Sequence, residues 1–545
     1  MNKKIELITP APHQGGAVAR SATEGGKKAT MLCIALFLAA CGGTERWGGE
    51  YSETAVRAPT SLYGGSSQYG GNIAVLLPDN DMGRGMEKSV EIALNRFRGG
   101  NVTAEFYPIS SDQEDARAKM LEALSGKYDI AIGPLFSNDV KFLRSAKDMR
   151  LPVLSFTTDR TALGSGAFSM SLLAGDGIES SLFKTTLDKR NGVFLFAPDT
   201  DSGRAMAGRA IAVADRMNIN IFGLEFYVEG NAKSIEQSAK NAAMFEARGK
   251  ANTRAREVLS DILLKETLSE KERESLTAQL EKISKRETLG APPYAAALLL
   301  GVATDSRQIV SYMRYFDADA GMVKFYGTPL WAGDEGILSD ITMSGSEFST
   351  MPEMSANFKE TFERMNDRAP IAMDYFAHDA AMLAAGGLQS GNIAAHILNP
   401  SGYRGMSGVF RLRPDGTIQR PLEMRRLGGG GEPTLTRAAA DNFIVPVYLD
   451  NVPYNVASRS IPLSGAGVNP DDFINIPERF QRKYKSKAYG ASSVLPVTTT
   501  ITFETNNEVF EVPQDEPEMP DATAAPTEIN KPEQIERKLI DSTTY

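Results

Sequence analysis

The sequence predicts an α/β protein of two lobes, in which each lobe is a parallel sheet with helices on both faces. The first observation is the run at residues 72–78 (NIAVLLP), which is short, continuous and rich in Ile, Val and Leu. That composition favours a strand buried on both faces, as in a parallel sheet. The second observation is the order strand, polar loop, helix, which recurs along the chain in two successive series.

The first series begins with the run at residues 72–78, which is followed by the polar loop 79–85 (DNDMGRG) and a helix. Ser111 or Asp112 can cap the next helix. The remaining strands of this series are expected at residues 102–109, 130–134 and 152–156.

The second series repeats this pattern. Residues 167–172 are expected to form a strand that crosses between the series, and the loop at 199–204 (DTDSGR) resembles the loop at 79–85. Two series imply two lobes with a cleft between them, and we assign residues 72–450 to this two-lobed domain. Its later strands are expected at residues 193–198, 221–228, 294–302 and 323–330.

A charged segment at residues 230–290 interrupts the second series. It is rich in Ala, Glu, Lys and Leu, and its apolar residues have helical spacing, so we expect a helical hairpin. Ser269 and Glu272 have the spacing of a capping box. The hairpin is either a partner-binding arm or a solvated decoration packed on the lobe, and the second role is the more common.

Two features are expected near the end of the chain. Residues 408–427 alternate in polarity around Asp415-Gly416, which predicts a β-hairpin, and Pro421 suggests that its return strand is an edge strand. Residues 451–545 lose this patterning and become rich in Pro, Glu, Asp and Thr, so we expect a low-complexity, largely disordered tail.

Composition excludes several functions. The 545 residues carry a formal net charge of −9, which argues against nucleic acid as the main partner. With three His and two Cys, both Cys near the N-terminus, a zinc site built from these residues is nearly excluded. We expect no metal and no cofactor.

The N-terminal residues predict a membrane anchor. Two lysines precede the apolar run at residues 31–40 (MLCIALFLAA), which has the length of a signal-peptide core. The run ends at Cys41 in a sequence that resembles a bacterial lipobox, so residues 1–40 are assigned to a signal peptide and Cys41 to lipidation. The alternative is an ordinary signal peptide with a chance cysteine. The Gly/Ser-rich residues 41–71 are expected to be a flexible tether.

No catalytic signature is present, neither a nucleophile elbow nor a zinc-protease motif nor a P-loop. What remains is a set of polar loops after the predicted strands, where open α/β sheets bind ligands. Ser137, Thr157 and Thr158 are candidates to hold an anion, and Trp331 is a candidate to cover an apolar ligand. Each has a structural alternative: a helix cap for Ser137, turn positions for the threonines, and the core for Trp331.

Several motifs resemble one family of bacterial lipoproteins. They are residues 327–331 (GTPLW), 375–380 (YFAHDA), 403–412 (YRGMSGVFRL) and 415–422 (DGTIQRPL). The lobe pattern resembles type I periplasmic binding proteins of the Leu/Ile/Val-receptor class, and these motifs resemble penicillin-binding protein activators of the LppC type. The resemblance covers about residues 72–447. The long N-terminal helical-repeat domain of the best-known members has no counterpart in residues 42–71.

The resemblance implies a non-enzymatic lipoprotein of the outer membrane that faces the periplasm and stimulates a peptidoglycan synthase. Gly42, in place of Asp, implies sorting to the outer membrane. The alternative is a solute receptor that binds an amino acid or a similar small anion in the interlobe cleft and feeds an ABC importer. A third hypothesis, a hydrolase, rests on the single helical histidine His378 and scattered serines.

Overall fold

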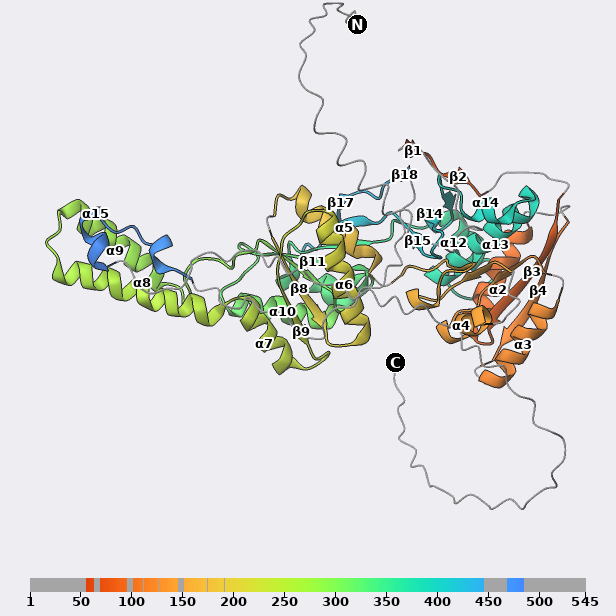
Figure 1. Cartoon of the computed structure of the whole chain (residues 1–545), viewed down its shortest axis with the longest axis horizontal. Coiled ribbons are helices and arrows are strands. Elements are labelled where there is room, and N and C mark those ends of the chain that lie inside the picture. Colours follow the sequence, from red (N-terminus) through yellow and green to blue (C-terminus); the bar gives the residue numbers. More distant parts are fainter. Residues whose placement is uncertain are drawn as a thin grey trace, which may run out of the picture. The chain divides into compact units, whose positions relative to one another are not determined.

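The computed structural model describes most of the chain between residues 55 and 484 (Figure 1). The predicted signal peptide, Cys41, residues 41–54 of the tether and residues 485–545 of the tail lie outside the described residues. The described ranges are 55–62, 69–95, 101–110, 112–126, 128–145, 151–173, 175–190, 192–445 and 468–484.

The first lobe is a five-stranded parallel sheet in the order β4-β3-β5-β6-β7. Its strands are β3 (Gly71–Pro78), β4 (Val102–Ile109), β5 (Ile130–Ile132), β6 (Val153–Ser155) and β7 (Ala167–Ser169). Its helices are α2 (Asp81–Leu94), α3 (Gln113–Ser125), α4 (Ser137–Ser145) and α13 (Ala372–Ser390).

Alternate residues of β3 enter two separate cores, because successive side chains of a strand point to opposite faces. Ile73 and Val75 pack with apolar residues of α2 and α13, whereas Ala74 and Leu76 pack with those of α3 and α4. The prediction of a strand buried on both faces is therefore confirmed, as is the helix cap at Asp112.

The second lobe repeats this order and extends it. Its sheet runs β9-β8-β10-β11-β12-β16-β17, parallel up to β12 and antiparallel beyond. Helices α7 and α10 cover one face, and α5 and α6 cover the other. The strands are β8 (Val193–Pro198), β9 (Ile221–Tyr227), β10 (Ala296–Leu299), β11 (Lys324–Gly327), β12 (Glu347–Thr350), β16 (Glu423–Arg426) and β17 (Thr434–Arg437). The four helices are α5 (Asp176–Leu187), α6 (Asp201–Arg216), α7 (Ala232–Ala242) and α10 (Ala303–Tyr315), and the short α11 (Glu335–Ser339) follows.

The two loops that look alike in sequence are helix starts that look alike in structure. Asn80 caps α2 by accepting a hydrogen bond from the Gly83 amide, and Thr200 caps α6 in the same way from Gly203. A Cβ on either glycine would lie 2.0 Å or less from the carbonyl oxygen of the preceding strand's proline. Both helices therefore begin inside the segments that were predicted as loops, residues 79–85 and 199–204.

After β12 the chain returns to the first lobe through α12 (Ala356–Glu363), α13 and α14 (Ile393–Ile397). A small sheet follows, in the order β15-β14-β13-β2. It comprises β2 (Thr60–Ser61), β13 (Tyr403–Gly405), β14 (Gly408–Leu412) and β15 (Ile418–Gln419).

The predicted hairpin at residues 408–427 is correct only in its first half. Strands β14 and β15 pair around Asp415-Gly416, but β15 ends at Gln419. The chain then passes Pro421 and enters the second sheet as β16, so Pro421 lies between two strands and not within one. Alternation of polarity along the segment does not show that its two halves belong to different sheets.

Two short strands lie within the range predicted as a flexible tether, which corrects that prediction for these residues. Strand β1 (Ala55–Arg57) pairs with β18 (Phe443–Val445), and β2 pairs with β13. Leu62 is buried in the core of the first lobe. The partner strands are distant in sequence, and the local composition gives no sign of them.

The insertion at 230–290 contains α7, α8 (Phe245–Lys265) and α9 (Glu270–Ser284), and the predicted capping box of Ser269 and Glu272 is confirmed. Residues 468–484, inside the range expected to be largely disordered, form η5 (Pro470–Asp472) and α15 (Glu478–Tyr484). Their apolar side chains share one core with α8 and α9. We call α8, α9 and residues 468–484 the arm. Among the described residues, no helix combines the length and hydropathy needed to cross a bilayer.

Candidate functional site

Three of the predicted site residues follow neighbouring strands of the first sheet. Ser137 is the first residue of α4, after β5, and is half-buried. Thr157 follows β6 and is buried; its Oγ1 accepts a hydrogen bond from the Asp159 amide, 3.1 Å away. Thr158, beside it, is exposed. The strand ends bring these residues to one edge of the sheet, and Thr157 also serves as a turn residue.

Trp331 lies elsewhere, in the core of the second lobe. It is fully buried, its ring packs with Phe348, and its Nε1–H donates to Ser306 Oγ at 3.0 Å. Its indole therefore fills the space beneath η3 (Pro329–Trp331) as a core side chain.

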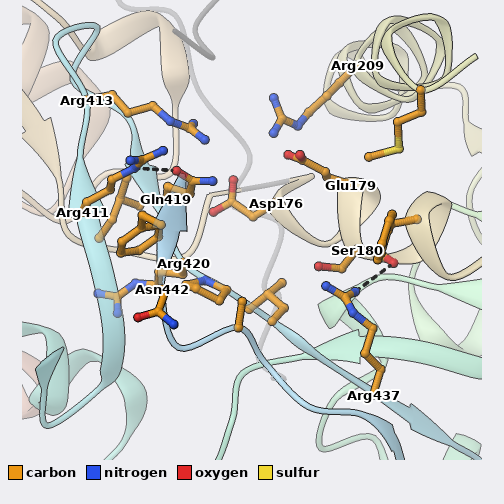
Figure 2. A pocket seen from close by; sticks show the side chains of 17 residues that line it. Asp176, Glu179, Ser180, Arg209, Arg411, Arg413, Gln419, Arg420, Arg437 and Asn442 are labelled. Carbon is orange, nitrogen blue, oxygen red and sulfur yellow. Dashed lines mark hydrogen bonds between the residues drawn. The ribbon is translucent and has the colours of Figure 1, made fainter. Parts of the chain in front are cut away.

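A pocket of about 430 Å³ lies beside the segments that connect the two lobes (Figure 2). One face of α5 lines it, with the small sheet opposite, and none of the four predicted residues takes part. Its lining residues are Asp176, Glu179, Ser180, Phe183, Arg209, Met217, Arg411, Arg413, Ile418, Gln419, Arg420, Pro421, Leu422, Arg437, Ala440, Asn442 and Phe443.

Five arginines line the pocket, and four of them are buried, each exposing 3% to 6% of its surface. Backbone carbonyls and aromatic rings hold several in place. Arg209 Nε donates to the Gly175 carbonyl at 3.1 Å, and Arg437 donates to that of Ser180 with its guanidinium 4.9 Å from the Phe183 ring centre. Such contacts orient a guanidinium without neutralising its charge.

Burial lowers the pKa of two of these arginines. The pKa of Arg411 falls to about 10 through burial and the positive charge of Arg413. Burial also lowers the pKa of Arg420 to about 10, against the attraction of Asp379 and Asp176. Both values are well above neutral pH, so both side chains stay charged there.

Two carboxylates share the pocket lining. Asp176 accepts from Arg160 at 2.6 Å and from the Leu173 amide at 2.8 Å, and these contacts fix it at the start of α5. Glu179 lies one turn further along the same helix face. With five arginines against two carboxylates, the formal charge of the lining is +3.

A buried hydrogen-bond network joins three of the motif segments, at residues 375–380, 403–412 and 415–422. The Asp379 carboxylate, on α13, accepts from the Met406 amide at 2.7 Å and from the Ser407 amide and hydroxyl at 2.8 and 2.5 Å. Arg420 then donates to Ser407 Oγ at 2.8 Å and to the Met170 carbonyl at 2.7 Å. Its guanidinium also lies over the rings of Phe376 and Phe410.

His378 is a packed core residue. It is fully buried, its Nδ1 lies 3.3 Å from Asp379 Oδ1, and its ring packs against Phe358. None of the lining residues of the pocket is a serine or cysteine paired with a histidine. The described residues also contain no group of three or more His, Cys, Asp or Glu placed to hold a metal ion.

Comparison with solved structures identifies the fold. A protein from Rhodospirillum rubrum described as a branched-chain amino acid ABC transporter matches 67% of this chain and 99% of its own, at 14% identity and a TM-score of 0.50. The chain has a type I periplasmic-binding-protein-like fold.

Two further structures illustrate the range of such matches. The C-domain of LpoA (YraM) from Haemophilus influenzae, a regulator of PBP1A, is 13% identical over 67% of this chain and 99% of its own, with a TM-score of 0.43. A solute-binding protein from R. palustris in complex with benzoate is 13% identical over 69% of this chain and 97% of its own, with a TM-score of 0.40. No family model and no curated protein sequence matches the chain.

Reasoning from sequence missed most of the pocket. Arg411 and Arg420 belong to the motifs described above and Arg413 lies between those motifs, but Arg209 and Arg437 carry no local signal. Seven lining residues fall between Arg411 and Leu422, namely Arg411, Arg413, Ile418, Gln419, Arg420, Pro421 and Leu422. The high density of arginine in this short stretch is the sequence feature that could have indicated the pocket.

Proposed function

We propose that this protein binds and regulates a periplasmic peptidoglycan synthase and catalyses no reaction itself. The observation that carries the proposal is the network of Asp379, Ser407 and Arg420. These residues come from three of the four segments whose sequence resembles the penicillin-binding protein activators. Residues that match a family pattern one by one and then meet in one buried network support common ancestry more strongly than scattered matches do.

The proposal includes the location of the protein in the cell. The protein is lipidated at Cys41, sorted to the outer membrane, and held there with its two-lobed body in the periplasm. One lipid-modified terminus suits such a role, since it keeps the body near the membrane while leaving both lobes free to meet a partner.

The proposal is tested by affinity purification of the tagged full chain from native membranes, followed by a synthesis assay. We expect a peptidoglycan synthase among the recovered proteins, and a faster rate of glycan polymerisation or crosslinking when purified chain is added to that synthase. Failure to recover any synthase, together with unaltered wall synthesis in a deletion strain, would refute the proposal.

A solute receptor remains the second candidate, because the fold is that of proteins that bind amino acids and Ser137 and Thr157 follow neighbouring strand ends. Thermal unfolding in the presence of each amino acid tests it, since a ligand at a hundred times its Kd stabilises the folded state by about 2.7 kcal/mol. A receptor shows a rise in melting temperature that Ser137→Ala and Thr157→Ala reduce. No rise with any amino acid counts against this function.

A further inference from the structure

The charge of the pocket near α5 differs in sign from that of the whole protein. The chain carries a net charge of −9, yet the lining of this pocket carries a formal charge of +3. Holding several guanidinium groups at one partly buried site costs desolvation and mutual repulsion. An anionic ligand between them offsets both costs.

The geometry of the arginines suits oxyanions. In Figure 2, the side chains of Arg413 and Arg209 extend into the pocket from opposite sides, one from the small sheet and one from α6. A guanidinium is planar and presents paired donors that match the oxygens of a carboxylate or phosphate. Arginines from separate elements can therefore hold two oxyanion groups or two sides of one.

Most of the uncharged side chains in the lining are apolar. Phe183, Met217, Ile418, Leu422 and Phe443 share the pocket with the arginines. A volume of about 430 Å³ lies within the range of small-molecule sites, which combine apolar walls with a few placed polar groups. A bare inorganic ion would leave these walls unused.

We propose that this pocket binds a small organic anion, with two or more oxyanion charges next to an apolar portion. It is a separate site from the strand-end residues Ser137, Thr157 and Thr158, and the inference stands whether or not the partner is a peptidoglycan synthase. Because the pocket takes residues from the small sheet and from α5 and α6, its ligand bridges elements of both lobes and links them.

Isothermal titration of the purified full chain at physiological ionic strength tests the proposal with matched probes. Phenyl phosphate and phthalate share a ring and differ in the oxyanion, and benzyl alcohol keeps the ring without the charge. We expect one or both anions to bind and the alcohol not to bind. Tighter binding of phenyl phosphate indicates a phosphate ligand, and tighter binding of phthalate indicates a carboxylate ligand.

Three variants locate the bound anion. Arg413→Gln removes one pocket charge and is expected to weaken binding about tenfold or more. Glu179→Gln removes a repelling carboxylate and is expected to strengthen binding severalfold, a gain that misfolding cannot produce. Arg204→Gln is the control: Arg204 lies on α6 like Arg209, but it pairs with Asp199 at the helix start and does not line the pocket.

Each outcome of these measurements either supports or overturns the proposal. Binding that Arg413→Gln weakens, Glu179→Gln strengthens and Arg204→Gln leaves unchanged supports the proposal. Absence of binding by both anions at millimolar concentration overturns it. So does binding that Arg413→Gln or Glu179→Gln leaves unchanged, or binding that Arg204→Gln weakens, since the anion would then lie elsewhere.

Discussion

Gly405 shows, at the residue scale, how a close contact can require a glycine even where the backbone does not. Its φ angle is not positive, so its conformation is open to other residues. A Cβ at this position would, however, lie 2.3 Å from Asp379 Oδ2. The carboxylate cannot retreat without losing its hydrogen bonds to Met406 and Ser407.

Gly405→Ala is therefore expected to destabilise the protein by about 2 kcal/mol, the usual cost of overpacking a tight site. Chemical denaturation measures the free energy of unfolding. Gly249→Ala is the matched control: Gly249 lies inside α8, and an added Cβ would meet nothing closer than 3.8 Å. There the gain in helix propensity should stabilise α8 by up to about 1 kcal/mol. Equal stability of both variants would contradict this account of Gly405.

The candidate site was harder to predict than the fold for a reason visible in single residues. Thr157 and Ser137 were chosen because ligands of open sheets bind at strand ends, a rule that depends only on local order along the chain. Arg209 lies on α6, Arg413 in the turn after β14 and Arg437 on β17, and each resembles an ordinary surface arginine in sequence. For Trp331 the sequence left open a ligand-covering role and a core role, and only the structure, in which the side chain is fully buried, favours the core, because burial depends on partners distant in sequence.

At the scale of elements, the arm also shows that contacts between segments distant in sequence are hard to predict. The sequence predicted its hairpin and its capping box from local spacing, which is sufficient for helices. It did not predict that residues 468–484 would pack against the hairpin. Phe480 enters the core of α8 and α9, Arg479 pairs with Glu272 at 2.7 Å, and the Asn475 amide donates to Gln279 at 2.7 Å.

Phe480→Ala should loosen the arm and leave the lobes intact, because Phe480 is 8% exposed and belongs to the core that residues 468–484 share with α8 and α9. A loss of about 3 kcal/mol is typical for a buried phenylalanine. Hydrogen exchange is expected to accelerate in α8 and α9 and to stay unchanged in α13. Arg482→Ala, at an exposed position of the same helix, is the control and should alter neither. Unchanged protection of α9 in Phe480→Ala would show that α8 and α9 are stable without this segment.

At the scale of the whole molecule, the two lobes share one strand order, with the first two strands exchanged and the next three in sequence. The two-lobed α/β architecture was predictable from sequence because strands buried on both faces are continuous apolar runs. The alternation of such strands with helices is compatible with few topologies. The extension of the second sheet by β16 and β17 was not predictable, since these strands arrive only after the chain has returned to the first lobe.

The proposed lipid anchor can be tested independently of the fold of the body. Cys41→Ser removes the thiol that would carry the lipid, while the described body begins only at residue 55. We expect this variant to leave the membrane fraction, because acyl chains supply most of the affinity of such a protein for a bilayer. The unfolding temperature of the described body should stay the same. Cys33→Ser, at the only other cysteine, lies before the expected cleavage site and should stay anchored. Fractionation and the mass of the N-terminal peptide measure both, and a Cys41→Ser variant that stays with the membranes would show that another segment holds the protein there.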